Sequence, residues 1–408
     1  MRILSIPVGL ALVLVACADD GSNDAPVDAG ADASADVVED AADAALDAAI
    51  DPGGDAADAS ADAADATPDV GPPPSPLDFD PREPGPFAAG YRSWDHTYTV
   101  PGTGEERTIL VNVWYPTDAT DGERPTYDGI FIDDYSVVDA PALPPVGATY
   151  PVHVHSHGHR AYGGDSAFLM RHFASHGFVA VAPDHVGDLF SAYPRADMLA
   201  HYIERASDIS QVLDALEALP ADDPLAAADV SRVTMSGHSR GTWTVWANLG
   251  ATFDVDAIEA DREDATPELL EVFAAGFDDP RIVAGLPMAG TYRDNWYGDG
   301  WSAVAEPVMS MTGSRDGDNA TASGMAQWDR IQLDDFVWLE FEGGCHQTFA
   351  LGSCGFLDVA LGYDLVTDYA LARARVFVLG DEDADVISAA RGEIELDEVI
   401  TALTAADR

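Results

Sequence analysis

The chain has 408 residues, enough for one large domain or two of ordinary size, and 47% of them are hydrophobic. It carries 72 Asp and Glu residues against 20 Lys and Arg, a formal net charge of −52, and every one of these basic residues is an arginine. Such an acidic surface repels phosphate backbones and anionic head groups, so we expect no nucleic-acid partner and no electrostatic attachment to membranes. A high-salt habitat would account for the acidity equally well.

The first 17 residues predict an export signal. One basic residue, Arg2, precedes an apolar run over residues 3–16, which is too short to span a bilayer, where about 20 residues are needed. Its end, from Leu14 to Cys17, resembles a bacterial lipobox, in which the cysteine carries lipid and becomes the mature N-terminus. We expect a lipoprotein anchored to the cell envelope, at the outer membrane or surface, or released from it; a plain signal peptide is the alternative.

Residues 18–85 predict a disordered acidic linker. Between Ala18 and Asp80 there are 18 Asp or Glu residues and no basic residue, and Ala, Gly and Pro fill most of the remainder. Such a segment buries too little apolar surface to offset its ordering entropy, and its uncompensated charge extends it. With Arg2 at +1 and this stretch at −18, residues 81–408 carry −35.

Residues 86–408 have the composition of one folded domain. Two stretches of alternating character, at 95–100 and 107–116, flank a Pro-Gly-Thr-Gly turn and predict an antiparallel hairpin. Six apolar runs further along the chain predict buried strands. In chain order they cover residues 150–158, 178–184, 231–236, 281–289, 307–312 and 335–341.

Helical patterns separate most of these runs. They cover residues 165–177, 198–219, 240–250 and 266–276, followed by two stretches around Tyr369 and Val399. Asp165 or Ser166 is placed to cap the first helix and Thr266 the fourth, and the spacing of Arg205 and Asp208 predicts a pair on a helix surface. Eight strands in this order predict an α/β domain with a doubly wound, mostly parallel sheet, whose ligands bind at the carboxyl ends of the strands.

A Gly-x-Ser-x-Gly motif lies where the fifth predicted strand gives way to a helix. In the sequence VTMSGHSRGT, Ser239 stands between Gly237 and Gly241. In this context the motif is typical of a nucleophile elbow, a strained turn that projects the hydroxyl above the sheet and needs glycines to avoid clashes. The turn also places the backbone N–H of Arg240 near a helix N-terminus, where it can stabilise an oxyanion. By itself the motif is short enough to recur by chance.

A serine hydroxyl is a weak nucleophile unless a base removes its proton, so a histidine and an orienting acid are expected on neighbouring strand ends. His346 follows the last predicted strand and Asp316 the one before it, with Asp318 as the competing acid. The chain order Ser239, Asp316, His346 is the one expected when such an elbow lies on this kind of sheet. For the second oxyanion donor we assign the backbone N–H of His159, after an earlier strand.

The stretch PVHVHSHGHRAYGGDSAFLMRHFASHGFVAVAPDH, together with GHSRG, resembles the α/β-hydrolase branch that contains platelet-activating-factor acetylhydrolases, chlorophyllases, dienelactone-hydrolase-like proteins and bacterial polyester hydrolases. The resemblance covers roughly residues 90–380. It implies the α/β-hydrolase fold, with Ser239 as nucleophile, Asp316 as acid, His346 as base and the two amides named above as the oxyanion hole. Dienelactone hydrolases proper use a cysteine nucleophile, so the serine here disfavours their reaction.

The expected function is therefore that of an exported serine hydrolase, which cleaves carboxylic esters through an acyl-enzyme and uses no metal or cofactor. Short-chain acyl esters, lipids, chlorophyll-like esters and polyesters all suit this branch, and we expect a monomer. Tyr162, Tyr292 and Trp296 are candidates for the substrate pocket; for the segment around Tyr292 and Trp296, a packed loop is the alternative.

Two other classes of function remain open. The run of His153, His155, His157 and His159 places alternating imidazoles on one strand face, as a metal-dependent hydrolase would require, although hydrogen-bonded core histidines are the simpler interpretation. A catalytically silent surface-binding protein on a hydrolase scaffold is the other class.

The sequence contains three cysteines. If Cys17 carries lipid, Cys345 and Cys354 remain as an even pair in an exported protein, which predicts a disulfide. Such a bridge would pin the loop that carries the proposed base. Two buried free thiols are the alternative.

Overall fold

The computed structural model describes residues 75–192, 197–290, 293–317, 327–352 and 354–408. Cys17, nearly all of the acidic linker, Tyr292 and Asp318 lie outside these ranges. The chain separates into two units, Met1–Pro68 and Asp69–Arg408, and the described residues all belong to the second. Within them, no helix combines the length and the apolar character that crossing a membrane requires.

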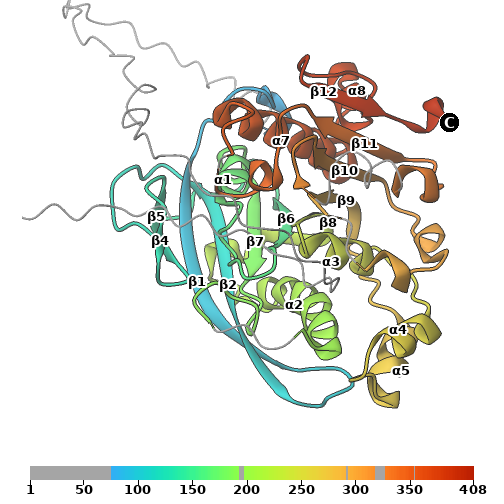
Figure 1. The fold of residues 1–408 in the computed structure, drawn as a ribbon. Helices are drawn as coiled ribbons and strands as arrows, with labels where there is room; N and C mark the ends of the chain where they lie inside the picture. The colour runs from blue at the N-terminus through green and yellow to red at the C-terminus, as the bar shows by residue number, and fades with distance from the viewer. Residues whose placement is uncertain (1–74, 193–196, 291–292, 318–326, 353) are drawn as a thin grey trace, which may run out of the picture. The chain divides into compact units, whose positions relative to one another are not determined.

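A ten-stranded sheet runs through the domain in the order β12-β11-β10-β9-β8-β6-β7-β2-β1-β5 (Figure 1). Its strands are β1 Ala88–Thr99, β2 Glu106–Thr117, β5 Ser136–Val138, β6 Tyr150–Ser156, β7 Val179–Pro183, β8 Ala228–His238, β9 Ile282–Met288, β10 Val308–Gly313, β11 Phe336–Phe341 and β12 Ile400–Leu403. Neighbours are antiparallel at β1/β2, β2/β7 and β11/β12, and parallel elsewhere. A separate hairpin joins β3 Thr126–Tyr127 to β4 Phe131–Ile132.

The predicted α/β class and mostly parallel sheet are confirmed, but the count of eight strands is not. All eight predicted strands are present, and β5 and β12 extend the sheet at its two edges. The helix predicted around Val399 is wrong, because the chain turns there and enters β12. With three and four residues, β5 and β12 are too short for a hydrophobic period to reveal them.

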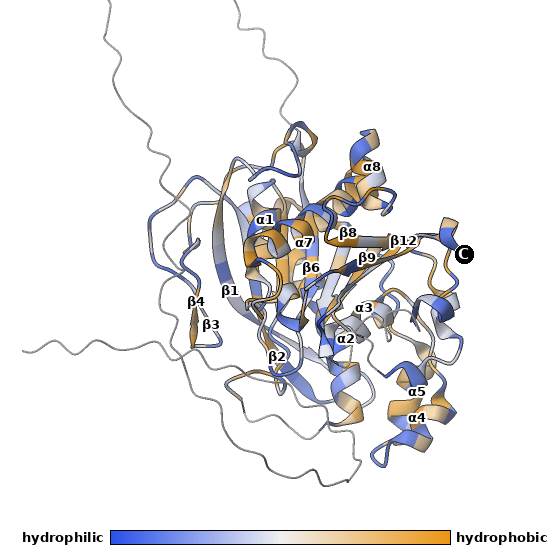
Figure 2. Ribbon diagram, turned by 45° about the horizontal axis from the view of Figure 1, so that its top comes forward, coloured by the Kyte–Doolittle hydropathy of each residue, from blue (hydrophilic) through white to orange (hydrophobic). Residues whose placement is uncertain are grey.

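Helices cover both faces of the sheet (Figure 1). The helices of the described residues are α1 Ala167–Ser175, α2 Leu199–Glu217, α3 Gly241–Asn248, α4 Val255–Asp261, α5 Pro267–Ala275, α7 Val359–Ala374 and α8 Ala384–Ala390. Helices α1 and α7 pack on one face, and α2 and α3 on the other, which divides the core into two hydrophobic clusters. Apolar residues are concentrated on the central strands and on the helices against them (Figure 2).

Strand β6 shows how the sequence builds both layers. All of its residues are buried, as expected for a central strand of a parallel sheet covered on both faces. Val152 and Val154 belong to the cluster with α2 and α3. His153 and His155 alternate with them and face the other layer, where the His153 ring stacks on Phe173 of α1 with 4.1 Å between centroids.

The predicted side-chain cap is present at the start of α5 and absent at the start of α1. Thr266 caps α5, since its side chain accepts from the Leu269 N–H. Ser166 precedes α1 but makes no capping bond; instead its hydroxyl donates to the Phe349 carbonyl at 3.0 Å. This bond ties the start of α1 to the segment that follows His346.

Candidate active site

Ser239 stands in the tight turn between β8 and α3. Its backbone is left-handed, with φ of 52°, a strained conformation that the bond from its N–H to the Met288 carbonyl, at 2.9 Å, helps to hold. A Cβ at Gly237 would overlap the Gly241 carbonyl, and a Cβ at Gly241 would overlap the Ser156 carbonyl. Close approach of the backbones therefore requires both glycines, as in a nucleophile elbow.

His346 and Asp316 lie in the loops that follow β11 and β10. The His346 Nδ1 donates to Asp316 Oδ1 at 2.8 Å; a carboxylate only accepts, so Nδ1 carries the proton and Nε2 is left as an acceptor. The Asp316 side chain is 4% exposed and the His346 side chain 22%. Within the described residues, Asp316 Oδ2 has no hydrogen-bond partner. The structure thus supplies an oriented imidazole with one basic nitrogen.

Backbone contacts hold these two loops against each other. The Arg315 N–H donates to the Gly344 carbonyl, and the Gly343 N–H donates to Ser314 Oγ, both at 2.8 Å. A Cβ at Gly313 would overlap the Gly344 carbonyl, so glycine permits the close approach. The distance between the imidazole and its carboxylate is therefore set by the backbones of two neighbouring parallel strands.

The elbow and the histidine loop meet through His238, the residue before Ser239. His238 Nε2 lies 3.0 Å from the backbone carbonyl oxygen of His346, and the two rings are 4.7 Å apart between centroids. His238 Nδ1 lies 3.6 Å from Asp165 Oδ2. The Ser239 hydroxyl makes no hydrogen bond within the described part of the chain. Ser239 thus lies beside the histidine loop, without a direct bond from its hydroxyl to the imidazole.

The loop after β6 passes next to Ser239, since a Cβ on Gly158 would lie 3.2 Å from the Ser239 Cβ. The N–H groups on either side of His159 bind carboxylate oxygens of Asp165 and Asp188, at 3.2 and 3.1 Å. The His159 N–H itself has no acceptor among the described residues. The N–H groups on either side of His159 therefore bind acceptors within the protein. The His159 N–H does not, so it can bind the oxygen of a substrate, as an oxyanion donor must.

The ring nitrogens of His153 and His155 are bound inside the sheet. His153 contacts the hydroxyls of Thr234 and Ser236, each at 2.8 Å, and His155 contacts the same Ser236 hydroxyl at 2.8 Å and Asp165 Oδ1 at 3.1 Å. Burial lowers the pKa of His153 well below its usual value. In the described ranges, no group of three or more His, Cys, Asp or Glu is placed to hold a metal ion. These contacts match the core-histidine interpretation.

His157 and His159 do not share those surroundings. His157 Nε2 accepts from the His185 N–H at 2.9 Å, so Nδ1 carries the proton and donates to the Gly158 carbonyl at 2.8 Å. Burial lowers the pKa of His157 to about 4. His159 is partly exposed, and its Nδ1 lies 2.5 Å from Asp188 Oδ1. The four histidines therefore bind different partners in the sheet and in the loops that follow β6 and β7.

Arg205 and Asp208 do not form the predicted helix-surface pair, since they are only 1% and 0% exposed. Arg205 donates to Asp188 Oδ2 at 2.9 Å. Asp208 accepts two bonds from the Arg107 guanidinium, each at 2.8 Å, and one from His185 Nδ1 at 2.8 Å. Their spacing of three residues fits one helix face, but it does not reveal that this face is turned inward.

Asp188 is a candidate that the sequence pattern did not single out. It lies in the loop after β7, is 4% exposed, and receives hydrogen bonds from three other segments of the chain. The available signal was its position, shortly beyond the carboxyl end of a predicted strand, where the functional groups of parallel sheets gather.

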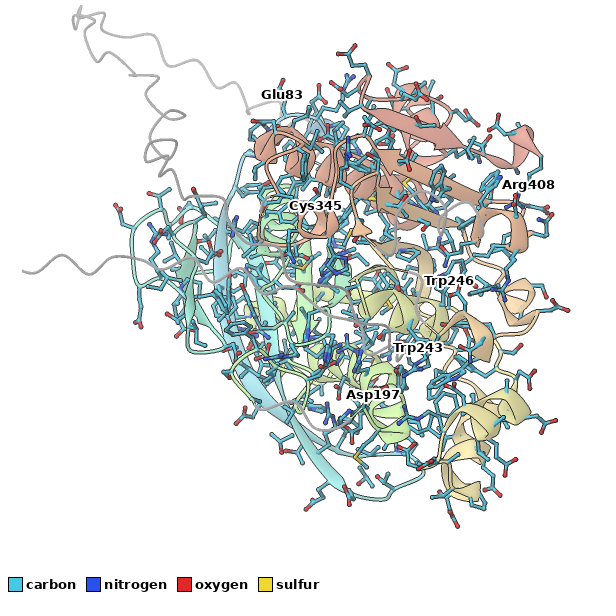
Figure 3. All side chains as sticks on the ribbon, in the orientation of Figure 1. Glu83, Asp197, Trp243, Trp246, Cys345 and Arg408 are labelled. Carbon is cyan, nitrogen blue, oxygen red and sulfur yellow. A yellow bond between two sulfur atoms is a disulfide. The ribbon has the colours of Figure 1, made fainter. Side chains whose placement is uncertain are left out.

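The described pocket candidates, Tyr162 and Trp296, both lie in packed surroundings. Tyr162 is 7% exposed and stacks on the phenyl ring at the start of β4, with centroids 4.4 Å apart. Trp296 is fully buried, and its Nε1 donates to Asp261 Oδ2 at 2.8 Å. It belongs to the same hydrophobic cluster as Trp243 and Trp246 of α3. Figure 3 labels these two residues on the ribbon. Trp296 is therefore part of the interior, as the packed-loop alternative predicts, rather than the wall of an open pocket.

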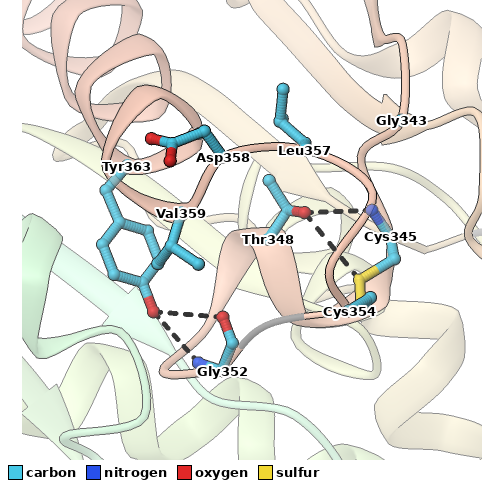
Figure 4. A pocket seen from close by; sticks show the side chains of 10 residues that line it. Gly343, Cys345, Thr348, Gly352, Cys354, Leu357, Asp358, Val359 and Tyr363 are labelled. Carbon is cyan, nitrogen blue, oxygen red and sulfur yellow. Dashed lines mark hydrogen bonds between the residues drawn. A yellow bond between two sulfur atoms is a disulfide. The ribbon is translucent and has the colours of Figure 1, made fainter. Parts of the chain in front are cut away.

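Cys345 and Cys354 form the predicted disulfide, with their Cα atoms 6.3 Å apart (Figure 4). The bridge closes the loop that contains His346. Within this loop, two residues before Cys354, the Gly352 N–H donates to the Tyr363 hydroxyl of α7 at 3.0 Å. A cavity of about 10 Å³, room for about one water molecule, lies between the loop and α7.

Residues 140–256 match the chlorophyllase family model. The match confirms the resemblance to the α/β-hydrolase branch that contains the chlorophyllases. It supports an α/β-hydrolase fold and ester hydrolysis as the type of reaction. A search among curated proteins found no match.

The chlorophyllase match covers part of the candidate site. It spans β6, β7 and β8, and so includes the His159 loop and the Ser239 elbow. Asp316 and His346 lie beyond it, on the strands that follow. Those two residues are linked to the site by the bond between them and by their place at the same edge of the sheet.

Proposed function

We propose that the protein is a serine hydrolase that cleaves carboxylic esters through Ser239, His346 and Asp316. The observation that supports this most directly is the strained Ser239 turn beside the loop that holds the His346–Asp316 pair, bonded at 2.8 Å. A hydroxyl nucleophile needs both an exposed position and an oriented base. In free enzymes the bond from the nucleophile to its base is often long and tightens when substrate binds, which fits the unbonded Ser239 hydroxyl.

In the proposed reaction, His346 Nε2 removes the Ser239 proton as the serine oxygen attacks the ester carbonyl. The N–H groups of His159 and Arg240 hold the oxygen of the tetrahedral intermediate, and each such donor typically contributes about 10²- to 10³-fold in rate. The imidazolium then protonates the leaving alkoxide, which departs and leaves the acyl group on the serine. Water attacks with the help of the same imidazole and releases the carboxylic acid. Asp316 keeps Nδ1 protonated and stabilises the imidazolium.

The substrate class we propose is an uncharged ester, such as a short-chain acyl ester, a lipid, a chlorophyll-like ester or a polyester. The charge of −35 on residues 81–408 supports this choice, since it repels anionic molecules. We further propose that residues 1–17 direct export, that Cys17 carries a lipid anchor and that residues 18–85 act as the tether of a monomeric enzyme. No step of this reaction draws on a metal or cofactor.

The test is the variant Ser239→Ala. We expect hydrolysis of p-nitrophenyl butyrate to fall to the rate without enzyme, because the variant removes the attacking oxygen and leaves the turn intact. Ser231→Ala is the matched control, since Ser231 is an exposed serine near the start of the same strand, and it should retain full activity. Activity is measured by release of p-nitrophenolate, and folding by circular dichroism.

A fluorophosphonate probe separates the proposal from a catalytically silent protein. The probe should label wild type and Ser231→Ala, and not Ser239→Ala. Hydrolysis that persists in a folded Ser239→Ala variant would remove this serine as the nucleophile. A wild-type protein that is neither labelled nor active would favour a binding protein on a hydrolase scaffold.

A further inference from the structure

One carboxylate links the two halves of the proposed oxyanion hole. Asp188 Oδ1 accepts from His159 Nδ1 at 2.5 Å and from the Arg160 N–H at 3.1 Å. Asp188 Oδ2 accepts from Arg205 at 2.9 Å and from the Arg240 guanidinium at 3.3 Å. The side chains of the two residues whose amides we assign as oxyanion donors, His159 and Arg240, therefore share a single buried partner.

We propose that Asp188 is a positioning residue that fixes the spacing between the amides of His159 and Arg240. The inference depends on the proposed function, because an oxyanion hole has a role only if Ser239 attacks a carbonyl. Asp188 does not itself touch the reacting atoms. It acts by holding the loop after β6 and the elbow after β8 in one arrangement.

The surroundings of Asp188 make this a rigid link. Arg205 on α2 also donates to the His157 carbonyl and, at 3.3 Å, to the Ser156 hydroxyl, so it fastens the end of β6 to the same carboxylate. The side chains of Asp188, Arg205 and Arg240 are no more than 5% exposed. In a buried site, each of these charge-assisted bonds is stronger and less mobile than it would be in water.

The charge on Asp188 is required for the link. Although burial alone would raise the pKa of Asp188, the hydrogen bond from His159 and the charges of Arg205 and Arg240 lower it below its ordinary value, so the carboxylate is ionised. A neutral amide at this position would accept fewer bonds and would turn an N–H₂ toward a cation. The two guanidinium groups would then lose the charge that they share at 2.9 and 3.3 Å, and the two loops would no longer be tied together through it.

The first test compares Asp188→Asn with Asp184→Asn. Asp184 is a matched control, because it is a buried carboxylate of the same loop that binds the Gly163 N–H at 2.7 Å and Asn112 at 3.1 Å. We expect kcat of Asp188→Asn to fall about 10- to 100-fold with KM within about threefold, the size expected when a reacting group is displaced by about 1 Å. Asp184→Asn should stay within about threefold of wild type.

A merely structural role would lower thermal stability without a selective loss of transition-state binding. Affinity for a trifluoromethyl ketone, which adds to the serine and forms an anionic hemiketal in the oxyanion hole, reports that binding. In Asp188→Asn the inhibition constant should rise by the same factor by which kcat/KM falls. Wild-type kcat and inhibition in a folded Asp188→Asn protein, or an equal loss in Asp184→Asn, would overturn the proposal.

His159→Ala keeps the inference testable if Asp188→Asn does not fold. The His159 side chain is 36% exposed, so its removal breaks one arm of the link and leaves the buried Arg–Asp bonds in place. We expect kcat and ketone affinity of His159→Ala to fall together, by about tenfold; where Asp188→Asn does fold, the double variant His159→Ala/Asp188→Asn should lose less than the product of the two single effects. Unchanged kinetics in His159→Ala would contradict the proposed positioning role of Asp188.

The two proposals can fail separately. If hydrolysis disappears in Ser239→Ala but is unchanged in Asp188→Asn and His159→Ala, only the role of Asp188 is wrong. If hydrolysis does not depend on Ser239, the proposed function fails, and the role of Asp188 fails with it.

Discussion

Asp184 is a buried carboxylic acid that the folded domain holds partly neutral near pH 6. Burial raises its pKa to about 6, although bonds from the Gly163 N–H and from Asn112 oppose the change. A group whose folded pKa is raised contributes stability that is complete below its unfolded pKa, about 3.9, and is lost as pH rises through the folded value. The wild-type domain therefore loses this contribution between about pH 4 and pH 6.

The variant Asp184→Asn should lack that pH dependence. An amide oxygen still accepts the Gly163 N–H, but no charge has to be buried when the pH rises. Relative to wild type, we expect the variant to gain about 1 kcal/mol of unfolding free energy between pH 5 and pH 8. Urea unfolding at several pH values measures this, and a stability difference that stays constant with pH would contradict it.

The turn around Ser239 could be predicted from the sequence because its geometry is local. The glycines two positions before and two positions after Ser239 indicate a close approach of the backbones. The five-residue motif is therefore enough to predict the elbow. Asp188 has no such signal, because its partners lie 17, 29 and 52 positions away. The burial of Arg205 could not be predicted for the same reason. Helical spacing indicates which residues share a face of the helix, but only tertiary packing determines whether that face is covered.

The loop closed by Cys345 and Cys354 constrains the position of the proposed base. It carries His346; the disulfide joins its two ends, and the Tyr363 hydroxyl binds it at Gly352 (Figure 4). A bridge of this short span stabilises a protein by about 2 kcal/mol, mainly because it restricts the unfolded chain. Its loss should also let the imidazole move relative to its carboxylate.

We therefore expect a reducing agent to lower the melting temperature and the esterase activity together. The double variant Cys345→Ala/Cys354→Ala is the control, because reductant should change neither property further. Intact mass under non-reducing conditions counts the thiols, and two free thiols in this pair would refute the bridge. A lower melting temperature with full activity would show that the bridge does not hold the base in place.

Burial also determines which strands can be predicted from the sequence. The central strands could be predicted because helices cover both faces of the sheet, so the buried stretches of these strands form mostly apolar runs in the sequence. The edge strands β5 and β12 were missed because three or four residues carry no period. The histidines of β6 show the limit of pattern alone: alternation placed His153 and His155 on one face, but only the structure shows that hydroxyls and a carboxylate occupy their nitrogens.

For the whole domain, buried histidines set the response to acid. Burial lowers the pKa values of His153, His157, His172, His176, His185 and His238. Stability from a group with a lowered folded pKa is present above its unfolded pKa, about 6.5, and is lost as pH falls below it, at up to about 1.4 kcal/mol per pH unit for each histidine. Asp184 and Asp368, with pKa values raised to about 6 and about 7, oppose this trend, but they are fewer.

The domain should therefore unfold in mild acid, with a midpoint near pH 5. His157, His172 and His176, whose pKa values are lowered to about 4, 3 and 4, can together remove about 7 kcal/mol between pH 6.5 and pH 4.5, which is comparable to a folding free energy of about 5–15 kcal/mol. Tryptophan fluorescence and circular dichroism during titration from pH 8 to pH 4 follow the transition. A stability that stays level or increases between pH 7 and pH 5 would contradict this expectation, and would mean that relief of acidic self-repulsion dominates.

The parallel order of β8, β9, β10 and β11 also sets when catalysis can appear during folding. Parallel neighbours are joined by crossovers, so each pairing closes a long stretch of chain and forms slowly. Ser239 follows the first of these strands and His346 the last, so a fragment that stops short of β11 lacks the base of the proposed catalytic centre. In a chain returning from denaturant, turnover of substrate would then recover later than helix content or compactness.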